Sequence, residues 1–181
     1  YFCLNVHGSL LPKFRGASPI QASLLNGDTE TGITLMKMNE SMDKGAILSK
    51  ETITIQDNDN LASLHDKLAE LGSKVLPGYI SDHLITGQFT LTPQDHVQAS
   101  YCKKIQKTDL ELDLKQTPIQ ILRKIRAFSP IPGAFVINNN RRVKILDAKI
   151  VDDELNILQV KPEGKSIMSY HDYCLAHPKI L

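Results

Sequence analysis

Three residues in the first quarter of the chain are of the types that carry out acyl transfer. Asn5 and His7 stand two positions apart at the end of an apolar run, and Asp43 follows in a short polar stretch before Gly45. A carboxamide, an imidazole and a carboxylate that meet at one point can hold an oxyanion and move a proton. Taken singly, each residue has an ordinary explanation as a core histidine, a strand cap or a turn aspartate. The hypothesis of a site rests on their combination.

The element that must position Asn5 and His7 is a strand predicted over residues 1–6, followed by a loop over 8–16. Side chains two apart on a strand share a face. A strand that ends in a Gly-Ser loop places them at the carboxyl edge of a sheet, where open α/β sheets bind ligands. We expect a parallel strand here, which needs neighbours on both sides, and therefore a further segment before Tyr1. The alternative is an edge strand of a small complete domain.

Local signals predict the other elements of the first half. A cap at Ser18 with Pro19 begins a short helix, and apolar alternation indicates two antiparallel strands joined by the turn that holds Asp43. Leucines at helical spacing define a long amphipathic helix, which Pro77 and Gly78 are expected to break or kink. The predicted ranges are a helix over 19–25, strands over 31–38 and 46–55, a turn over 39–45 and a helix from 61 to 87.

The second half is predicted to be a small β domain. Residues 89–108 show no strong period and are interpreted as a linker. Thr117 and Pro118 begin a helix whose apolar stripe is Ile119, Leu122 and Ile125. Short strands with polar turns are typical of a small barrel or sandwich. These strands are predicted over 134–137, 142–146, 148–151 and 155–160, and a last short helix begins after Ser169.

Composition and charge restrict the class of protein. The 181 residues are 41% apolar and 23% charged, which is typical of a globular protein of one or two domains. No apolar run reaches the roughly 20 residues that cross a bilayer, and no secretory leader is visible. The three cysteines are odd in number and far apart, which favours reduced thiols and a cytoplasmic protein.

The net charge of +1 is unevenly distributed. Residues 103–149 contain 11 Lys/Arg against 4 Asp/Glu, a local balance of +7. Such asymmetry suits a polyanionic partner, and a solvated surface facing nothing in particular is the open alternative.

No motif for a metal or a nucleotide is present. His171, Cys174 and His177 are three apart, but no fourth ligand stands at a usual zinc spacing. The chain contains no P-loop, no GxGxxG fingerprint and no GxSxG nucleophile elbow. We therefore expect no metal.

Several blocks of the sequence resemble the folate-dependent formyltransferases. The matching blocks are NVHGSLLP at 5–12, RGA at 15–17, PIQ at 19–21, NGD at 26–28, ETG at 30–32 and MDKG at 42–45. IRAFSPIPGA at 125–134 and VKPEGK at 160–165, followed by Met168 and Ser169, are similar to the members that formylate methionyl-tRNA.

The resemblance implies roles for single residues. The family's catalytic asparagine, histidine and aspartate fall on Asn5, His7 and Asp43. Its folate-contacting loop falls on Ser9, Leu10, Leu11 and Pro12. The formyl donor would be 10-formyltetrahydrofolate and the acceptor the α-amino group of initiator methionyl-tRNA, in translation initiation. We expect no membrane association and a monomer.

The resemblance also implies an α/β fold. Residues 1–88 would be the C-terminal half of a Rossmann-like formyltransferase domain, 89–108 a linker, and 109–181 an OB-like β-barrel that helps to hold tRNA. Two departures stand out, because the first half of the nucleotide fold is absent and the barrel is shortened near Asp152. The alternatives are a sugar-nucleotide N-formyltransferase, with the same trio and another acceptor, and an inactive truncated fragment or nucleic-acid-binding module.

Overall fold

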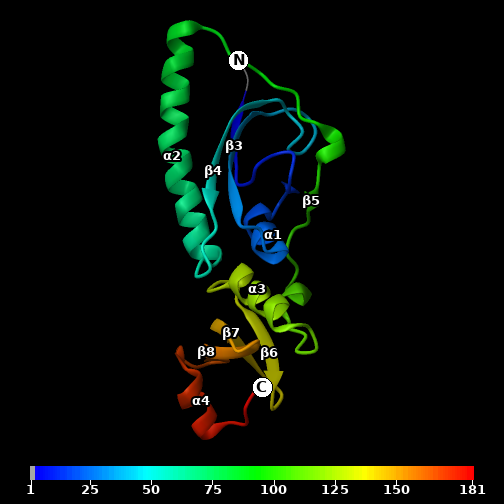
Figure 1. The fold of residues 1–181 in the computed structure, drawn as a ribbon, viewed down its shortest axis with the longest axis vertical. Helices are drawn as coiled ribbons and strands as arrows, with labels where there is room; N and C mark the ends of the chain where they lie inside the picture. The colour runs from blue at the N-terminus through cyan, green and yellow to red at the C-terminus, as the bar shows by residue number, and fades with distance from the viewer. Residues whose placement is uncertain (1–2) are drawn as a thin grey trace. The chain divides into compact units, whose positions relative to one another are not determined.

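The computed structural model describes residues 3–181, apart from the side chains of Asp82 and Leu84, and divides the chain into two compact units. Figure 1 shows the order of the elements along the chain. The first unit consists of Tyr1–Ser23, Asp28–Asp59 and Ser63–Ile105, and the second of Leu24–Gly27, Asn60–Ala62 and Gln106–Leu181.

A three-stranded antiparallel sheet forms the centre of the first unit. Its strands β1 (Leu4–His7), β3 (Glu30–Lys37) and β4 (Ile47–Thr54) lie in the order β1-β3-β4. The predicted antiparallel pairing of the second and third strands is confirmed. The parallel setting expected for the first strand is wrong, because β3 runs back beside β1 in antiparallel register. Residues 1 and 2 of the predicted strand lie outside the described residues.

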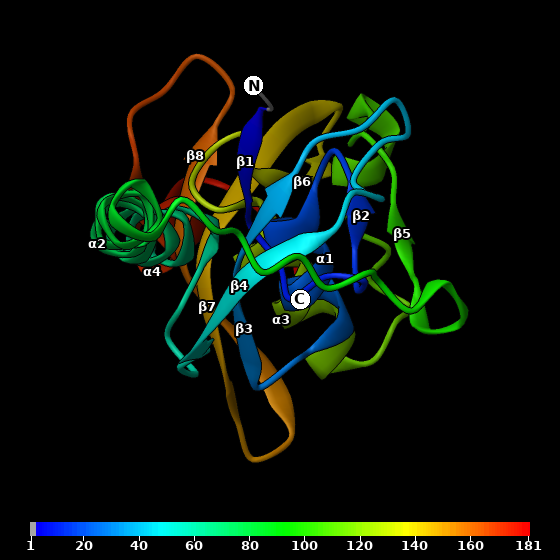
Figure 2. The ribbon, with the colours of Figure 1, turned by 90° about the horizontal axis from the view of Figure 1, so that it is seen from above.

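Two helices accompany this sheet. α1 (Pro19–Asn26) begins at the predicted proline, and α2 (Leu61–Thr86) packs through Gly72, where a Cβ would lie 3.2 Å from Val6 of β1. Figure 1 shows α2 from the side as one continuous helix, and Figure 2 views it along its axis. The break expected at Pro77 is therefore wrong. A proline frees a single carbonyl one turn earlier, here that of the exposed Ser73, where water can reach it.

Asp59, just before α2, holds the start of the helix. Its carboxylate is 2% exposed and accepts hydrogen bonds from Gln56 N at 2.8 Å, Ser63 Oγ at 2.8 Å and Lys67 Nζ at 2.7 Å. Burial alone would raise the pKa of Asp59, but the hydrogen bonds from Lys67, Gln56 and Ser63 outweigh it and hold the pKa below 3.8. A lowered folded-state pKa stabilises the protein above the unfolded value, and this stability is lost as the pH falls through the folded value.

Replacing Asp59 with asparagine should lower the free energy of unfolding at pH 7 by about 1–3 kcal/mol, because a charged acceptor of several hydrogen bonds is removed. The deficit should shrink as the pH falls through the lowered folded-state pKa of Asp59, because the wild-type carboxylate then becomes protonated as well. Urea unfolding followed by circular dichroism, at pH 7 and at a pH below the folded-state pKa, measures this difference in the free energy of unfolding. Asp66→Asn is the matched control, since its side chain is 83% exposed. A deficit of equal size at both pH values would contradict the explanation.

The chain after α2 continues in the first unit as far as Ile105. Thr92 bridges to Ile47, η1 (His96–Gln98) follows, and β5 (Tyr101–Cys102) pairs in parallel with β2 (Arg15–Gly16). The segment predicted as a linker thus contributes backbone pairing and, at Gln94, a buried side chain.

The second unit is built on a four-stranded antiparallel sheet in the order β6-β7-β8-β9. Its elements are η2 (Lys107–Leu110), α3 (Pro118–Phe128), β6 (Ala134–Asn138), β7 (Arg141–Val151), β8 (Glu154–Pro162), β9 (Met168–Ser169) and α4 (Tyr170–Ala176). β7 is one strand, where two were predicted, because register shifts between Ile145 and Ala148 carry the pairing past Asp147.

The helices α3 and α4 begin at the capping residues that the sequence predicted. Thr117 accepts a hydrogen bond from Gln120 N at the start of α3, and Ser169 accepts one from Asp172 N at the start of α4. The buried face of α3 is rotated by part of a turn from the apolar stripe that the sequence predicted. Ile125 is buried with Ile121 and Phe128, whereas Ile119 is 43% exposed. Ile119, Ile121 and Leu122 are all apolar, so the sequence allowed either register.

Within residues 3–181, none of the helices combines the length and the apolar character that crossing a membrane requires.

Candidate active site

His7 is the last residue of β1, and its imidazole ring is held by its surroundings. Its side chain is 6% exposed, and Nε2 lies 3.0 Å from the backbone oxygen of Phe14. A carbonyl can only accept, so Nε2 carries the proton and donates it. In the neutral imidazole, the lone pair is therefore on Nδ1.

Asp43 approaches this lone pair from the bend between β3 and β4. Its backbone adopts a positive φ of 52°, and Oδ1 lies 3.7 Å from His7 Nδ1. Oδ2 accepts a hydrogen bond of 2.8 Å from the backbone N–H of Gly16. Two acceptors facing each other are unfavourable until a proton enters between them. A proton on Nδ1 would lie between the ring and the carboxylate, which would stabilise an imidazolium.

Asn5 lies on the same face of β1 as His7, because the two residues are two apart in a strand. It is half-buried, and its carboxamide forms no hydrogen bond with another described residue. Because this amide has no other partner within residues 3–181 and lies on the same strand face as His7, it can donate a hydrogen bond to an oxyanion.

The loop after β1 is fixed by Thr34 of β3. Thr34 Oγ1 donates to Ser9 O at 2.6 Å and accepts from Leu11 N at 2.9 Å. Ser9 and Leu11 are fully buried, whereas Leu10 and Pro12 keep part of their surface. Leu10 and Pro12 are therefore the residues of this loop whose side chains can meet a ligand.

Two family models match the chain, in order. The formyl transferase model matches residues 2–80, and the model of the formyl transferase C-terminal domain matches residues 104–156. The chain belongs to the formyl transferase family.

Relatives in this family are similar over most of the chain. The methionyl-tRNA formyltransferase of Nitrosomonas europaea is 46% identical over 149 residues, which are 82% of this chain and 46% of that protein. The methionyl-tRNA formyltransferase of Methylococcus capsulatus is 38% identical over an alignment of 202 positions, gaps included, which covers 97% of this chain and 64% of that protein. The chain thus spans about half to two thirds of the length of these relatives.

Solved structures share the fold. Methionyl-tRNA formyltransferase from Clostridium thermocellum has a TM-score of 0.70 at 20% identity, over 90% of this chain and 69% of that one. WlaRD, a sugar 3N-formyl transferase solved in the presence of dTDP and 5-N-formyl-THF, has a TM-score of 0.68 at 21% identity, over 90% of this chain and 66% of that one. The formyltransferase α/β fold expected from the sequence is therefore confirmed.

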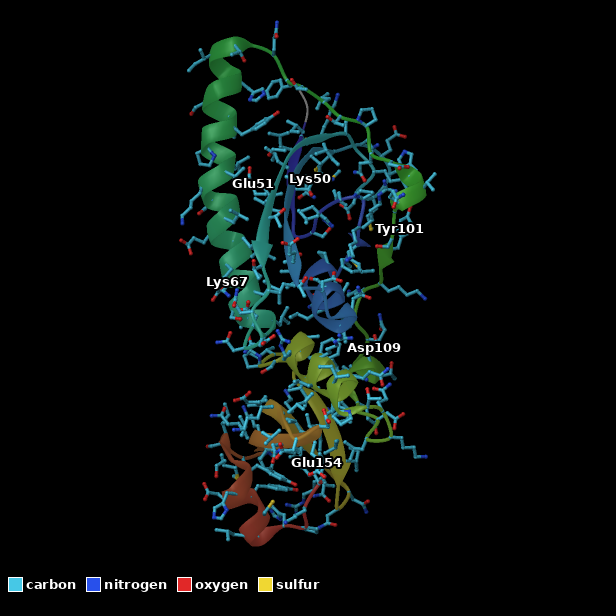
Figure 3. The ribbon with its side chains drawn as sticks, viewed as in Figure 1. Lys50, Glu51, Lys67, Tyr101, Asp109 and Glu154 are labelled. Carbon is cyan, nitrogen blue, oxygen red and sulfur yellow. The ribbon has the colours of Figure 1, made fainter. Side chains whose placement is uncertain are left out.

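Three residues that the sequence did not predict as site residues lie behind the Asp43 bend of this formyltransferase family member. Gln94 Nε2 donates to the backbone oxygens of Asp43 at 2.9 Å and Gly45 at 2.7 Å. Arg15 donates to Gln94, and it also donates to the hydroxyl of Tyr101 at 3.2 Å, which lowers the pKa of that hydroxyl. Figure 3 labels Tyr101, which projects from β5. Arg15 stood in the predicted loop, but no sequence signal marked Gln94 or Tyr101.

The remaining histidines lie apart from the trio in their contacts. His65 contacts Asp66 on the exposed side of α2, and His177 packs against the ring of Tyr173. In the part of the chain that the structure describes, no group of three His, Cys, Asp or Glu residues is placed to hold a metal ion.

Proposed function

We propose that this chain carries the catalytic residues of an enzyme that transfers a formyl group from 10-formyltetrahydrofolate to the α-amino group of initiator methionyl-tRNA, in translation initiation. The observation that carries the proposal is the approach of Asp43 Oδ1 to within 3.7 Å of His7 Nδ1, with the free carboxamide of Asn5 on the same strand face. The resemblance of the sequence to methionyl-tRNA formyltransferases supports the choice of donor and acceptor.

In the proposed reaction, the neutral amine attacks the formyl carbon, a C–N bond forms and the carbonyl oxygen becomes an oxyanion. Asn5 donates a hydrogen bond to this oxyanion, and one such donor is typically worth about 3 kcal/mol in the transition state. His7 Nδ1 takes the proton that the attacking amine loses. Asp43 stabilises the imidazolium, which then protonates the folate nitrogen as its bond to the formyl carbon breaks.

The loop of Ser9, Leu10, Leu11 and Pro12 is proposed to contact the folate. Leu10 and Pro12 supply the accessible surface, while the buried Ser9 and Leu11 fix the loop through Thr34. The chemistry of the donor set is consistent with a formyl group, since it offers one amide donor and one proton carrier and requires no metal.

The test of the function is formation of formyl-methionyl-tRNA from radiolabelled 10-formyltetrahydrofolate, in competition with an amino-sugar nucleotide. Transfer to methionyl-tRNA is the expected result, and transfer to the sugar would identify the sugar-nucleotide alternative instead. Retention of tRNA without any binding of folate would favour a fragment that only binds nucleic acid. The domain division at 88/89 and 108/109, the OB-like barrel, the cytoplasmic location and the monomer stay predictions.

A basic pocket in the second unit suits the proposed tRNA partner. Arg142, Lys144 and Lys161 line a cavity of about 230 Å³ together with Glu163. Lys144 of β7 and Lys161 of β8 are directly opposite in register. Like charges at facing positions destabilise a sheet, and a phosphate between them would relieve the repulsion.

Replacing Lys144 and Lys161 together with glutamine should weaken retention of tRNA and reduce the slope of log K against log salt by about 1–2, because fewer counterions are released. Filter binding at several salt concentrations measures the slope. Lys179→Gln, in the same unit but outside the pocket, is the control. An unchanged slope in the double variant would show that this pocket meets no phosphate.

A further inference from the structure

A fully buried arginine lies behind the candidate active site. Arg15 is 1% exposed, and in the described residues no carboxylate lies within ion-pair distance of it. Its Nε and Nη2 donate to Gln94 Oε1 at 3.0 and 2.6 Å, Nη2 also lies 3.0 Å from His96 Nδ1, and Nη1 donates to Tyr101. A buried charge among neutral partners costs several kcal/mol, so packing alone does not explain this residue.

The contacts of Gln94 show what the arginine holds. An arginine only donates and a backbone carbonyl only accepts, so both ends of the Gln94 amide have a forced orientation. Oε1 faces Arg15, and Nε2 faces the carbonyls of Asp43 and Gly45. Gln94 is 6% exposed, so water does not compete for these bonds.

The held bend is the one that aims the carboxylate. Asp43 has a positive φ of 52°, a backbone conformation that is less favourable for an L-residue, so contacts that hold the backbone there help to maintain it. Its carboxylate reaches both Gly16 N and His7 Nδ1 from this backbone position. Release of the two carbonyls by Gln94 would therefore let the carboxylate move away from the imidazole.

We propose that Arg15 and Gln94 are positioning residues that lock the Asp43 bend so that its carboxylate faces His7, a role that rests on the proposed formyl transfer. Neither residue touches the reacting atoms. Arg15 fixes the orientation of the Gln94 amide, and Gln94 fixes the backbone at Asp43. Misplacing a reacting group by about 1 Å can cost on the order of 100-fold in rate.

Gln94→Glu separates positioning from packing. The new carboxylate can pair with Arg15, which offsets part of the cost of the two lost hydrogen bonds, so a folded protein with a modest loss of Tm is expected. It cannot donate to Asp43 and Gly45, so the bend should loosen. In the ¹⁵N,¹³C-labelled chain, the Gly16 amide proton and the Asp43 and Gly45 carbonyl carbons should shift. Exchange of the Gly16 amide should accelerate about tenfold or more, and kcat of the complete enzyme should fall about 10- to 100-fold with KM nearly unchanged.

Gln98→Glu makes the same charge change at an exposed site of η1 and should leave all these signals unmoved. If Gln94→Glu does not fold, Arg15→Lys tests the same idea, because lysine keeps the charge but loses the paired contact with Gln94. The Asp43 and Gly45 carbonyls are then the probes. Unchanged Asp43, Gly45 and Gly16 signals in a folded variant would overturn the positioning role. Shifted signals in a protein whose wild type transfers no formyl group would instead reject the proposed function and leave the lock intact.

Discussion

Replacing Asp43 with asparagine is expected to lower kcat for formyl transfer by about 10²–10⁴-fold in the complete enzyme, with the fold unchanged. Asparagine has the same shape, and its oxygen can still accept from Gly16 N, which lies 2.8 Å from Oδ2 in the wild type. It removes the negative charge beside His7 Nδ1 and places an amide NH2 donor there instead. The imidazolium formed during proton transfer would then be unsupported.

His7→Gln should have a similar effect on kcat, because a glutamine amide can donate to the Phe14 carbonyl but cannot carry a proton at neutral pH. Single-turnover assays with methionyl-tRNA measure both variants. His65 and Asp66 form a second histidine–aspartate contact of 3.2 Å on the exposed side of α2 and supply the controls His65→Gln and Asp66→Asn, which should keep wild-type rates. Near-normal turnover in both site variants would end the assignment of the trio.

Gly16→Ala is expected to lower the free energy of unfolding of the first unit by about 2–5 kcal/mol. Gly16 has a φ of +119°, and a Cβ there would lie 2.2 Å from the backbone oxygen of Cys102, its partner in β5. The substitution combines a disallowed backbone angle with a backbone clash. It also displaces the N–H that binds Asp43.

Two other glycines separate the cost of the backbone angle from the cost of the steric clash. Gly87 has a φ of +66° with nothing within 4 Å of a Cβ, so Gly87→Ala should cost about 1–2 kcal/mol. Gly78 lies inside α2 with nothing within 4 Å, so Gly78→Ala should be neutral or stabilising by up to about 1 kcal/mol. Chemical denaturation ranks the three variants. Equal stability of the Gly16 and Gly87 variants would show that the close approach to β5 is not as described.

Local chemistry in the sequence predicted much of the fold. Ser18 with Pro19, Thr117 and Ser169 each marked a helix start that the structure has. Failures arose where tertiary context decides. Helix α2 continues through Pro77 because the freed carbonyl is at the surface, and β7 passes Asp147 because a register shift absorbs it.

The same distinction applies to the candidate site, where local patterns predicted some features and contacts between distant residues determine the others. The strand period placed Asn5 and His7 on one face, and the family resemblance pointed to Asp43. The tautomer of His7 depends on Phe14, seven residues away, and Gln94 reaches Asp43 across 51 positions. Such contacts have no local period, so a single sequence without coordinates does not reveal them.

The anchors of Asp43 come from outside the central sheet. Its bend is held by hydrogen bonds between a side chain and the backbone, from the Gln94 amide to the Asp43 carbonyl and from Gly16 N to the Asp43 carboxylate. The strands β1, β3 and β4 are instead joined by backbone hydrogen bonds to one another. Local opening of a protein begins where few backbone pairs must break. Warming should therefore loosen the Asp43 bend at a lower temperature than the one at which the strands melt, so that the proposed formyl transfer is lost before the β signal.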